Sequence, residues 1–245
     1  MASSLKKIIG YTFLVQVIVF GVGILNHIFM SRWLGPEGFG VVATFLAIAE
    51  TIHRFTNVGL ETAVIYFLGN KRFHNQKLVG AYFINALFLF CVGFIVLLVF
   101  FNTSIPEMLF KSMDRASLQE YAWLGVPLLL GFMAYEYGIR IPLGLQRFKQ
   151  YNSLQFIKPV SLLILLVLVF CFADVNISSV VILLGLTWFL AGAAAWHSAI
   201  PFTPLLDKKI TTEMVKYGKK VWVGNFINYF NYRADIFLIG FFLSQ

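Results

Sequence analysis

The chain has 245 residues and a formal net charge of +8; 59% of its residues are hydrophobic and only 12% are charged. Soluble domains carry a charged fraction of roughly 25%, so the composition excludes a water-soluble globular enzyme. An aromatic content of 17% excludes intrinsic disorder, and two cysteines are too few for a disulfide scaffold. The remaining class is an all-α polytopic membrane protein.

Long apolar runs predict where the chain crosses the membrane, because a spanning helix needs about 20 such residues. We expect seven transmembrane helices, over residues 8–32, 40–69, 78–101, 119–143, 154–173, 177–200 and 217–243. The first run lacks a small-residue cleavage site, which predicts a retained anchor. The connection 201–216 is predicted to separate one unit, residues 1–203, from another, residues 204–245.

The distribution of lysine and arginine predicts the orientation. With the N-terminus in the cytoplasm, most of the 19 basic residues fall on the cytoplasmic side, in segments 6–7, 71–77, 147–158 and 208–220. The opposite side holds only Arg32, Lys111 and Arg115. This positive-inside pattern predicts a cytoplasmic N-terminus. Because the basic residues are split among four short loops, we expect no nucleic-acid partner. The densest basic segment, 208–220, is a candidate for contact with anionic membrane lipids.

Ionic and amide side chains in the second apolar run form a candidate site. Charges at membrane depth cost about 2.5–3.5 kcal/mol each, so they mark a function or a buried pair. Glu50, Arg54, Asn57 and Glu61 are spaced so that one continuous helix would carry them on a single stripe. Two interpretations are open: a structural Glu50–Arg54 pair with an interfacial Glu61, or a stripe that lines a hydrated cavity.

Two later runs also carry polar residues at membrane depth. These are Glu136 and Arg140 in the fourth run, and Asn225, Asn228, Arg233 and Asp235 in the seventh. The two asparagines share a helix face with Asp235, whereas Arg233 lies nearly opposite Asp235. The simplest bundle that satisfies every stripe surrounds a central water-filled cavity, whose arginines would attract an anion such as a phosphate.

Motifs of catalytic and metal sites are absent from the sequence. It contains no H-E-x-x-H, C-x-x-C, P-loop or G-x-S-x-G pattern. The histidines at 27, 53, 74 and 197 lack metal-ligand spacing. We therefore expect no catalytic residue, no cofactor and no metal, and we expect that the protein is not an enzyme.

Two segments resemble a known family. Residues 31–69, SRWLGPEGFGVVATFLAIAETIHRFTNVGLETAVIYFLG, resemble the first two helices of the polysaccharide flippases, which are joined by an L-G-P-x-x-[FY]-G turn. Residues 216–245 resemble the seventh helix of those proteins, with its [RS]-x-D-x-x-[LI]-[LI]-G-x-[FL] pattern. These flippases belong to the multidrug/oligosaccharidyl-lipid/polysaccharide exporter superfamily. The resemblance implies one six-helix lobe over 1–203 and, over 204–245, the interlobe connection with the first helix of an incomplete second lobe, in a fragment of a longer protein.

The resemblance also implies a function. It implies a flippase of the bacterial inner membrane that moves polyprenyl-pyrophosphate-linked oligosaccharides, for O-antigen or exopolysaccharide synthesis, by alternating access with polysaccharide assembly proteins as partners. The residues expected to contact the substrate are Arg54, Arg140, Arg233, Asn57, Asn225 and Asn228. The residues expected to tune the cavity or bind a coupling H⁺ or Na⁺ are Glu50, Glu61, Glu136 and Asp235.

Three other functions stay open. A multidrug/cation antiporter of the same superfamily would favour a cavity of acids and aromatic residues, whereas here arginines offset much of the acidic charge. A flippase for peptidoglycan precursors is not separable by sequence. A membrane-embedded glycan polymerase or ligase would need a large outer loop with catalytic residues, and the longest predicted loop, 102–118, is short.

Overall fold

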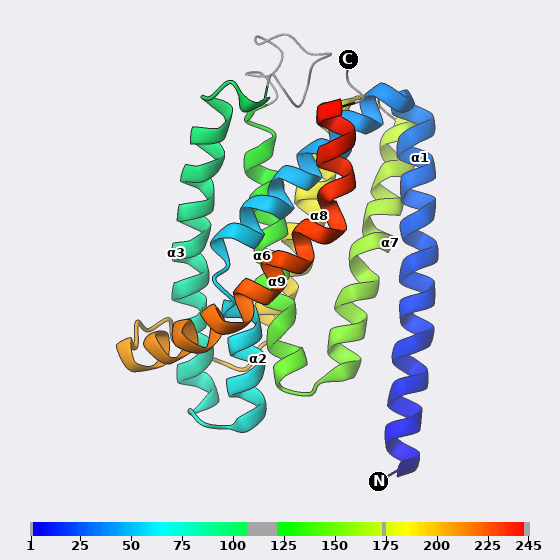
Figure 1. Ribbon diagram of the computed structural model, residues 1–245. Coiled ribbons are helices and arrows are strands. Elements are labelled where there is room, and N and C mark those ends of the chain that lie inside the picture. Colours follow the sequence, from blue (N-terminus) through cyan, green and yellow to red (C-terminus); the bar gives the residue numbers. More distant parts are fainter. Residues whose placement is uncertain (1, 107–121, 173–174, 243–245) are drawn as a thin grey trace.

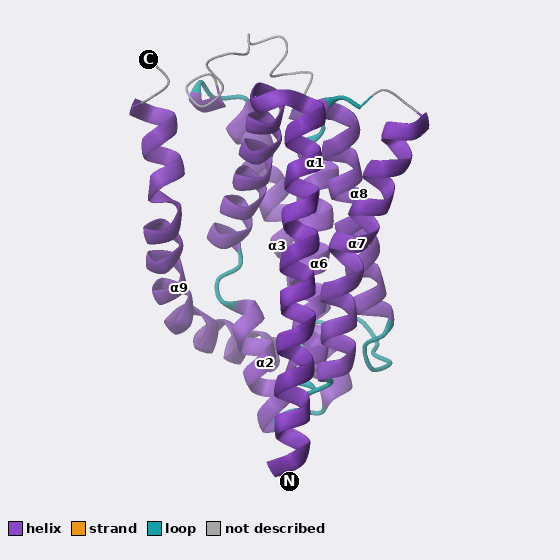
Figure 2. Cartoon of the chain, turned by 90° about the vertical axis from the view of Figure 1, so that its right-hand side faces the viewer, coloured by secondary structure: helices purple, strands orange, loops and turns teal. Residues whose placement is uncertain are grey.

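The computed structural model describes residues 2–106, 122–172 and 175–242, with only the backbone described at 2–5, 230 and 232–242. Within these ranges the chain forms helices and no strand (Figures 1 and 2). The helices are α1 Ala2–Thr56, α2 Leu60–Asn70, α3 Asn75–Phe101, α6 Gly125–Gly144, α7 Phe148–Phe172, α8 Ile177–His197 and α9 Lys208–Phe242. The prediction of an all-helical protein is confirmed for the described part of the chain.

The apolar helices match those of an integral membrane protein. In the described residues, 4 helical segments are long and apolar enough to cross a bilayer: Lys6–Thr56, Asn75–Phe101, Phe148–Phe172 and Ile177–His197. The first contains the predicted run 8–32 and the beginning of the predicted run 40–69, up to Thr56. In the described part of the chain, α6 and α9 are not among these candidate spans. The number of seven transmembrane helices thus stays a prediction.

A sharp reversal joins the first two predicted runs. Gly35 has φ 70° and ψ 174° and interrupts α1, and Pro36 follows it. A positive φ suits glycine, and proline suits a first helical turn because its missing N–H has no helical partner there. Figure 1 shows α1 rising from the N-terminus, turning at the top of the bundle and returning obliquely into it. The structure thus has a turn where the L-G-P-x-x-[FY]-G resemblance implies one.

Helices α6 and α8 approach each other through small residues. A Cβ at Gly131 would lie 2.1 Å from the carbonyl oxygen of Gly185, and a Cβ at Gly192 would lie 2.5 Å from the carbonyl carbon of Ala134. Such close backbone contact is typical of helix pairs in membranes, where small residues at the interface let the two backbones approach each other. The contact fixes α6, which carries Glu136 and Arg140, at the centre of the bundle.

The second predicted run, 40–69, is not one helix. Helix α1 ends at Thr56 and α2 begins at Leu60, and between them Val58 and Gly59 have φ of 49° and 72°. The interruption coincides with the crossing of α9: a Cβ at Gly59 would lie 2.1 Å from the carbonyl oxygen of Gly218. Non-helical backbone at membrane depth is tolerated where protein buries it. The continuous stripe expected for this run is therefore wrong.

Helix α9 begins earlier than expected. The predicted connection 201–216 becomes helical at Lys208, where Asp207 caps the helix by accepting a 3.0 Å hydrogen bond from the Ile210 N–H. The first turns of α9 lie across the bundle beside α2, and the helix then bends and runs along the bundle (Figures 1 and 2). It contacts α1, α2 and α3. The division into residues 1–203 and 204–245 stays a prediction.

We expect Gly218→Ala to destabilise the protein. A Cβ at residue 218 would lie 2.5 Å from the Val58 carbonyl oxygen, and overpacking of this kind costs about 1–3 kcal/mol. Gly224→Ala is the matched control, because a Cβ there meets nothing within 4 Å. Thermal unfolding in detergent measures the difference: the melting temperature falls for Gly218→Ala only. Equal melting temperatures would contradict the close crossing.

Candidate functional site

A polar cavity of about 620 Å³ lies between α1, α2, α6 and α9. Its volume is within the roughly 300–1,000 Å³ of small-molecule sites. Its lining residues are Glu50, Arg54, Glu61, Thr62, Ile65, Arg140, Asn225, Asn228 and Tyr229. We call it the central cavity. Ionic and amide side chains from separate helices thus meet at one cavity inside a bundle of apolar helices.

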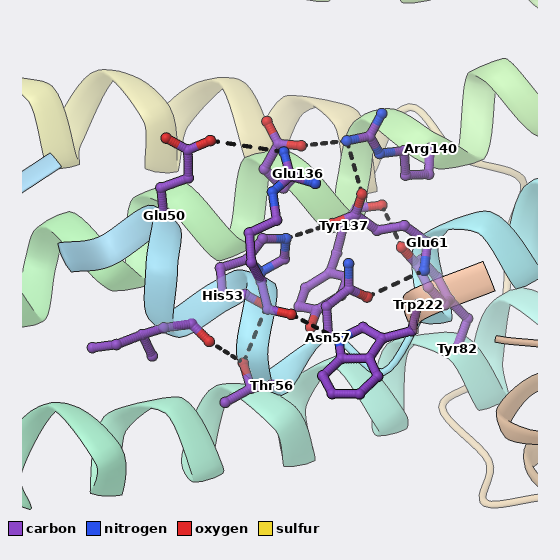
Figure 3. A network of polar contacts seen from close by, with 12 residues as sticks. Glu50, His53, Thr56, Asn57, Glu61, Tyr82, Glu136, Tyr137, Arg140 and Trp222 are labelled. Carbon is purple, nitrogen blue, oxygen red and sulfur yellow. Dashed lines mark hydrogen bonds and ion pairs between the residues drawn. The ribbon is translucent and has the colours of Figure 1, made fainter. Parts of the chain in front are cut away.

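Glu61 joins three helices at the wall of this cavity (Figure 3). Its Oε1 lies 2.5 Å from Nε2 of His53 on α1, and its Oε2 lies 2.8 Å from Nη2 of Arg140 on α6. Arg140 also forms an ion pair with Glu136, one turn earlier on α6. Because Glu61 is only 5% exposed, these contacts replace the water that an ionised carboxylate needs.

The helix interruption makes the contact between His53 and Glu61 possible. Residues eight apart in an unbroken helix are separated by about 12 Å along its axis. Here α2 starts in a new direction, which places the Glu61 carboxylate beside the His53 ring. The His53 ring is fully buried, with the rings of Phe132 and Tyr137 edge-on at 5.3 and 5.1 Å. Its Nδ1 has no hydrogen-bond partner among the described residues.

A histidine and two carboxylates near Arg140 also have the composition of a cation site. The ligand atoms of His53, Glu61 and Glu136 all lie within 4.8 Å of one another, and imidazole and carboxylate are common metal ligands. The Arg140 guanidinium contacts both carboxylates, so the protein itself supplies a compensating charge. A bound cation would have to displace Arg140 from at least one of them.

Arg54 is held more loosely than Arg140. Its Nη2 lies 3.9 Å from Oε1 of Glu50, and its side chain is 33% exposed, against 22% for Arg140. Its Nε has no hydrogen-bond partner in the described part of the chain. Both interpretations of the sequence therefore apply to these residues, since Glu50 and Arg54 form an i,i+4 pair and also line the central cavity.

Trp222 attaches α9 to the end of α1. Its indole N–H donates a 2.8 Å hydrogen bond to the Arg54 carbonyl oxygen, which lies in the last turn of α1, where carbonyl groups lose their helical partners. Figure 3 shows Trp222 beside Asn57 at the interruption. The contact holds α9, with Asn225 and Asn228, against the central cavity.

The remaining predicted site residues lie elsewhere. Asn57 is buried at the interruption, where its Oδ1 accepts a 3.4 Å hydrogen bond from the Glu61 N–H, and it does not line the central cavity. Glu136 is paired with Arg140 and is not among the lining residues of the central cavity (Figure 3). The side chains of Arg233 and Asp235 are outside the described residues.

A second polar cavity, of about 240 Å³, lies on the other side of Arg140, between α1, α6 and α7. Glu136, Arg140 and Lys158 line it, and the Lys158 ammonium lies 4.4 Å from the ring centre of Tyr135 and 5.1 Å from that of Trp188. Lys158, which is assigned to the predicted cytoplasmic segment 147–158, lies ten residues into α7, about 15 Å along the helix.

Lys158 balances the charge of the ionic side chains that line the two cavities beside Arg140. The described side chains around Arg140 include three carboxylates, at Glu50, Glu61 and Glu136, and the three cations are Arg54, Arg140 and Lys158. The formal charges of these six side chains sum to zero, and such a balance is favoured in apolar surroundings because an unpaired buried charge is costly. Sequence reasoning missed this role of Lys158 although the residue lies inside the apolar run 154–173.

We expect Lys158→Met to lower the stability of the protein by about 2 kcal/mol, the contribution of a desolvated cation–π contact. Lys158→Arg keeps the charge and is expected to retain most of the stability. Lys149→Met removes the same charge from an exposed position of α7 and serves as control. Thermal unfolding in detergent measures the three variants. A melting temperature of Lys158→Met no lower than that of Lys149→Met would refute the role.

The chain matches one known family along almost its full length. The family model described as "Polysaccharide biosynthesis protein" matches residues 5–245. No curated protein and no solved structure matches the chain. The matched range includes every residue of the central cavity and of the network around Glu61.

Proposed function

The chain belongs to the polysaccharide biosynthesis protein family, the family of the polysaccharide flippases, and on that premise we propose that it carries lipid-linked oligosaccharides across the bacterial inner membrane. The proposed substrate is a polyprenyl-pyrophosphate that bears a sugar repeat unit. The protein moves this substrate by alternating access and leaves it chemically unchanged. Its N-terminus is in the cytoplasm, where most of the basic segments would then lie.

The central cavity is the observation that supports this proposal most strongly. Charged side chains inside an apolar bundle mark a function or a buried pair, and charges that line an open cavity favour the entry of a polar group. Here arginine, carboxylate and amide groups from four helices line about 620 Å³. Asn225 and Asn228 offer both donors and acceptors, which suits sugar hydroxyl groups. The polyprenyl chain would stay in the bilayer while the headgroup crosses.

The two arginines of the cavity are proposed to act differently. Guanidinium groups bind phosphate oxygens in a bidentate manner. Arg54 is the candidate contact for the pyrophosphate, because it is loosely paired and faces the cavity. Arg140 is held by Glu61 and Glu136, so its proposed role is to organise the cavity wall and to change partners during transport.

Glu61 is the proposed point of ion coupling. Its carboxylate contacts both His53 and Arg140, so a proton or a Na⁺ on that carboxylate would weaken its attraction for Arg140. Glu50 and Glu136 would then be the remaining partners of the arginines in the described part of the cluster. A coupling ion that binds Glu61 would in this way alter the wall of the central cavity.

A transport assay tests the proposed function. The full-length protein is reconstituted into proteoliposomes with a fluorescent polyprenyl-pyrophosphate oligosaccharide, and an impermeant quencher reports its movement between leaflets. We expect faster movement than in protein-free liposomes. No acceleration, combined with ion-driven uptake of a cationic dye, would contradict the proposal and favour the antiporter.

A further inference from the structure

A separate basic cavity lies where the start of α9 crosses the end of α2. Its volume is about 310 Å³, and its lining residues are Tyr66, Phe67, Arg72, Glu213, Lys216, Tyr217 and Lys220. It shares no lining residue with the central cavity. In Figure 1 the first turns of α9 lie across the end of the bundle that also holds the turn between α2 and α3. We call it the end cavity.

The end cavity carries a surplus of positive charge. Nη2 of Arg72 lies 2.8 Å from Oε2 of Glu213, so this pair is neutral. Lys216 and Lys220 are exposed, lie one turn apart on α9, and form no ion pair with any described carboxylate. Two ammonium groups therefore remain to bind an anion.

Aromatic rings form the rest of the wall. The rings of Tyr66 and Tyr217 are stacked, with centroids 4.2 Å apart, and Tyr66 is 41% exposed. The Arg72 guanidinium lies 5.8 Å from the ring centre of Phe67. Tyrosine with lysine or arginine is typical of the membrane–water boundary, where rings contact the lipid and cations contact the headgroups.

We propose that the end cavity binds the phosphodiester headgroup of an anionic phospholipid. Paired ammonium groups attract the phosphate, and the exposed ring of Tyr66 offers a surface for the glycerol and the first acyl carbons, which a free phosphate lacks. The basic segments predict that this end of the bundle faces the cytoplasmic leaflet, whose anionic lipids attract polybasic segments. The inference does not depend on the identity of the transported molecule.

The bound lipid would hold α9 against the interruption between α1 and α2. Gly218 lies between Lys216 and Lys220 in the sequence, and its backbone contacts Gly59. A headgroup that fixes the two lysines also fixes this crossing. The lipid would thus stabilise the packing of α9 beside the central cavity.

Lipid-dependent thermal unfolding tests the site. The purified protein is melted in a neutral detergent with phosphatidylglycerol, with phosphatidylcholine, or with inorganic phosphate. We expect phosphatidylglycerol to raise the melting temperature by several degrees and the other two to leave it unchanged. An equal shift with inorganic phosphate would overturn the lipid assignment, and the absence of any shift with phosphatidylglycerol would overturn the site.

Matched variants locate the effect. Lys216→Gln/Lys220→Gln is expected to abolish the phosphatidylglycerol shift. Lys208→Gln/Lys209→Gln removes the same charge from exposed positions of the same helix outside the cavity, and is expected to keep the shift. Equal shifts in the two double variants would refute the site. If the first double variant does not fold, the single variants Lys216→Gln and Lys220→Gln give the same comparison, with retained lipid counted by native mass spectrometry.

Discussion

Replacing Arg140 by glutamine is expected to destabilise the protein by about 3–5 kcal/mol, the usual effect of removing one partner from a buried ion pair. The guanidinium contacts both Glu61 and Glu136, and its loss leaves two carboxylates at membrane depth without their cation. Thermal unfolding in detergent is expected to show a much lower melting temperature, and reconstituted protein is expected to show no transport.

Two variants separate the ion pair from a general loss of charge. Arg147→Gln removes the same charge from an exposed position just after α6 and is expected to change neither property. Arg140→Gln/Glu136→Gln removes one carboxylate together with the cation, and is expected to recover part of the stability but not the transport. An Arg140→Gln protein as stable as Arg147→Gln would show that the network around Glu61 does not hold these helices together.

Arg54→Gln is expected to weaken binding of the pyrophosphate lipid by roughly ten- to a hundredfold, because a hydrogen bond to a charged group contributes about 1.5–3 kcal/mol. The melting temperature is expected to stay near that of the unmodified protein, because the Glu50–Arg54 pair is long, at 3.9 Å, and partly exposed. A concentration series in the transport assay measures the effect as a higher KM.

Arg54→Lys is the control for geometry. It keeps the charge and loses the planar fork that matches two phosphate oxygens, so we expect an intermediate KM. Unchanged transport by both Arg54→Gln and Arg54→Lys would remove Arg54 from the substrate site. A large fall in the melting temperature of Arg54→Gln would instead make it a structural residue like Arg140.

Apolar length and local turn chemistry predicted much of the fold. The helices α3, α7 and α8 follow the apolar runs closely because lipid-facing residues must be apolar along the whole helix. The turn after the first run was expected from the resemblance to the L-G-P-x-x-[FY]-G turn, and Gly35 has a positive φ there. The meeting of Arg54, Glu61 and Arg140 at one cavity agrees with the predicted central cavity, because charged side chains at membrane depth avoid lipid even where the helix that carries them is interrupted.

The interruption between α1 and α2 was not predicted, because it depends on a distant helix. The residues Asn57, Val58 and Gly59 contain a local signal, since glycine and asparagine favour positive φ, but hydropathy over 40–69 is continuous. The close approach of Gly218 makes the interrupted backbone fit. The contact between His53 and Glu61 follows only from that geometry.

Lys158 makes contacts that counting the charges of the loops does not predict. A lysine near the end of an apolar run is usually assigned to the adjacent cytoplasmic loop. In the structure its stem follows α7 and its ammonium lies over two aromatic rings inside the bundle. Neither hydropathy nor loop charge predicts that Tyr135 and Trp188, on two other helices, both lie within cation–π distance of this ammonium.

Labelling of introduced cysteines by a membrane-impermeant thiol reagent tests most directly whether the central cavity is hydrated. Cysteine is introduced at Thr62 or Asn225, which line the cavity, or at Phe88, which is 65% exposed on the outer face of α3, after Cys91 and Cys171 are replaced by alanine. Because thiolates form in water and not in hydrocarbon, we expect labelling of Thr62→Cys and Asn225→Cys in intact membranes and none of Phe88→Cys. Cavity cysteines as unreactive as Phe88→Cys would contradict a water-filled cavity.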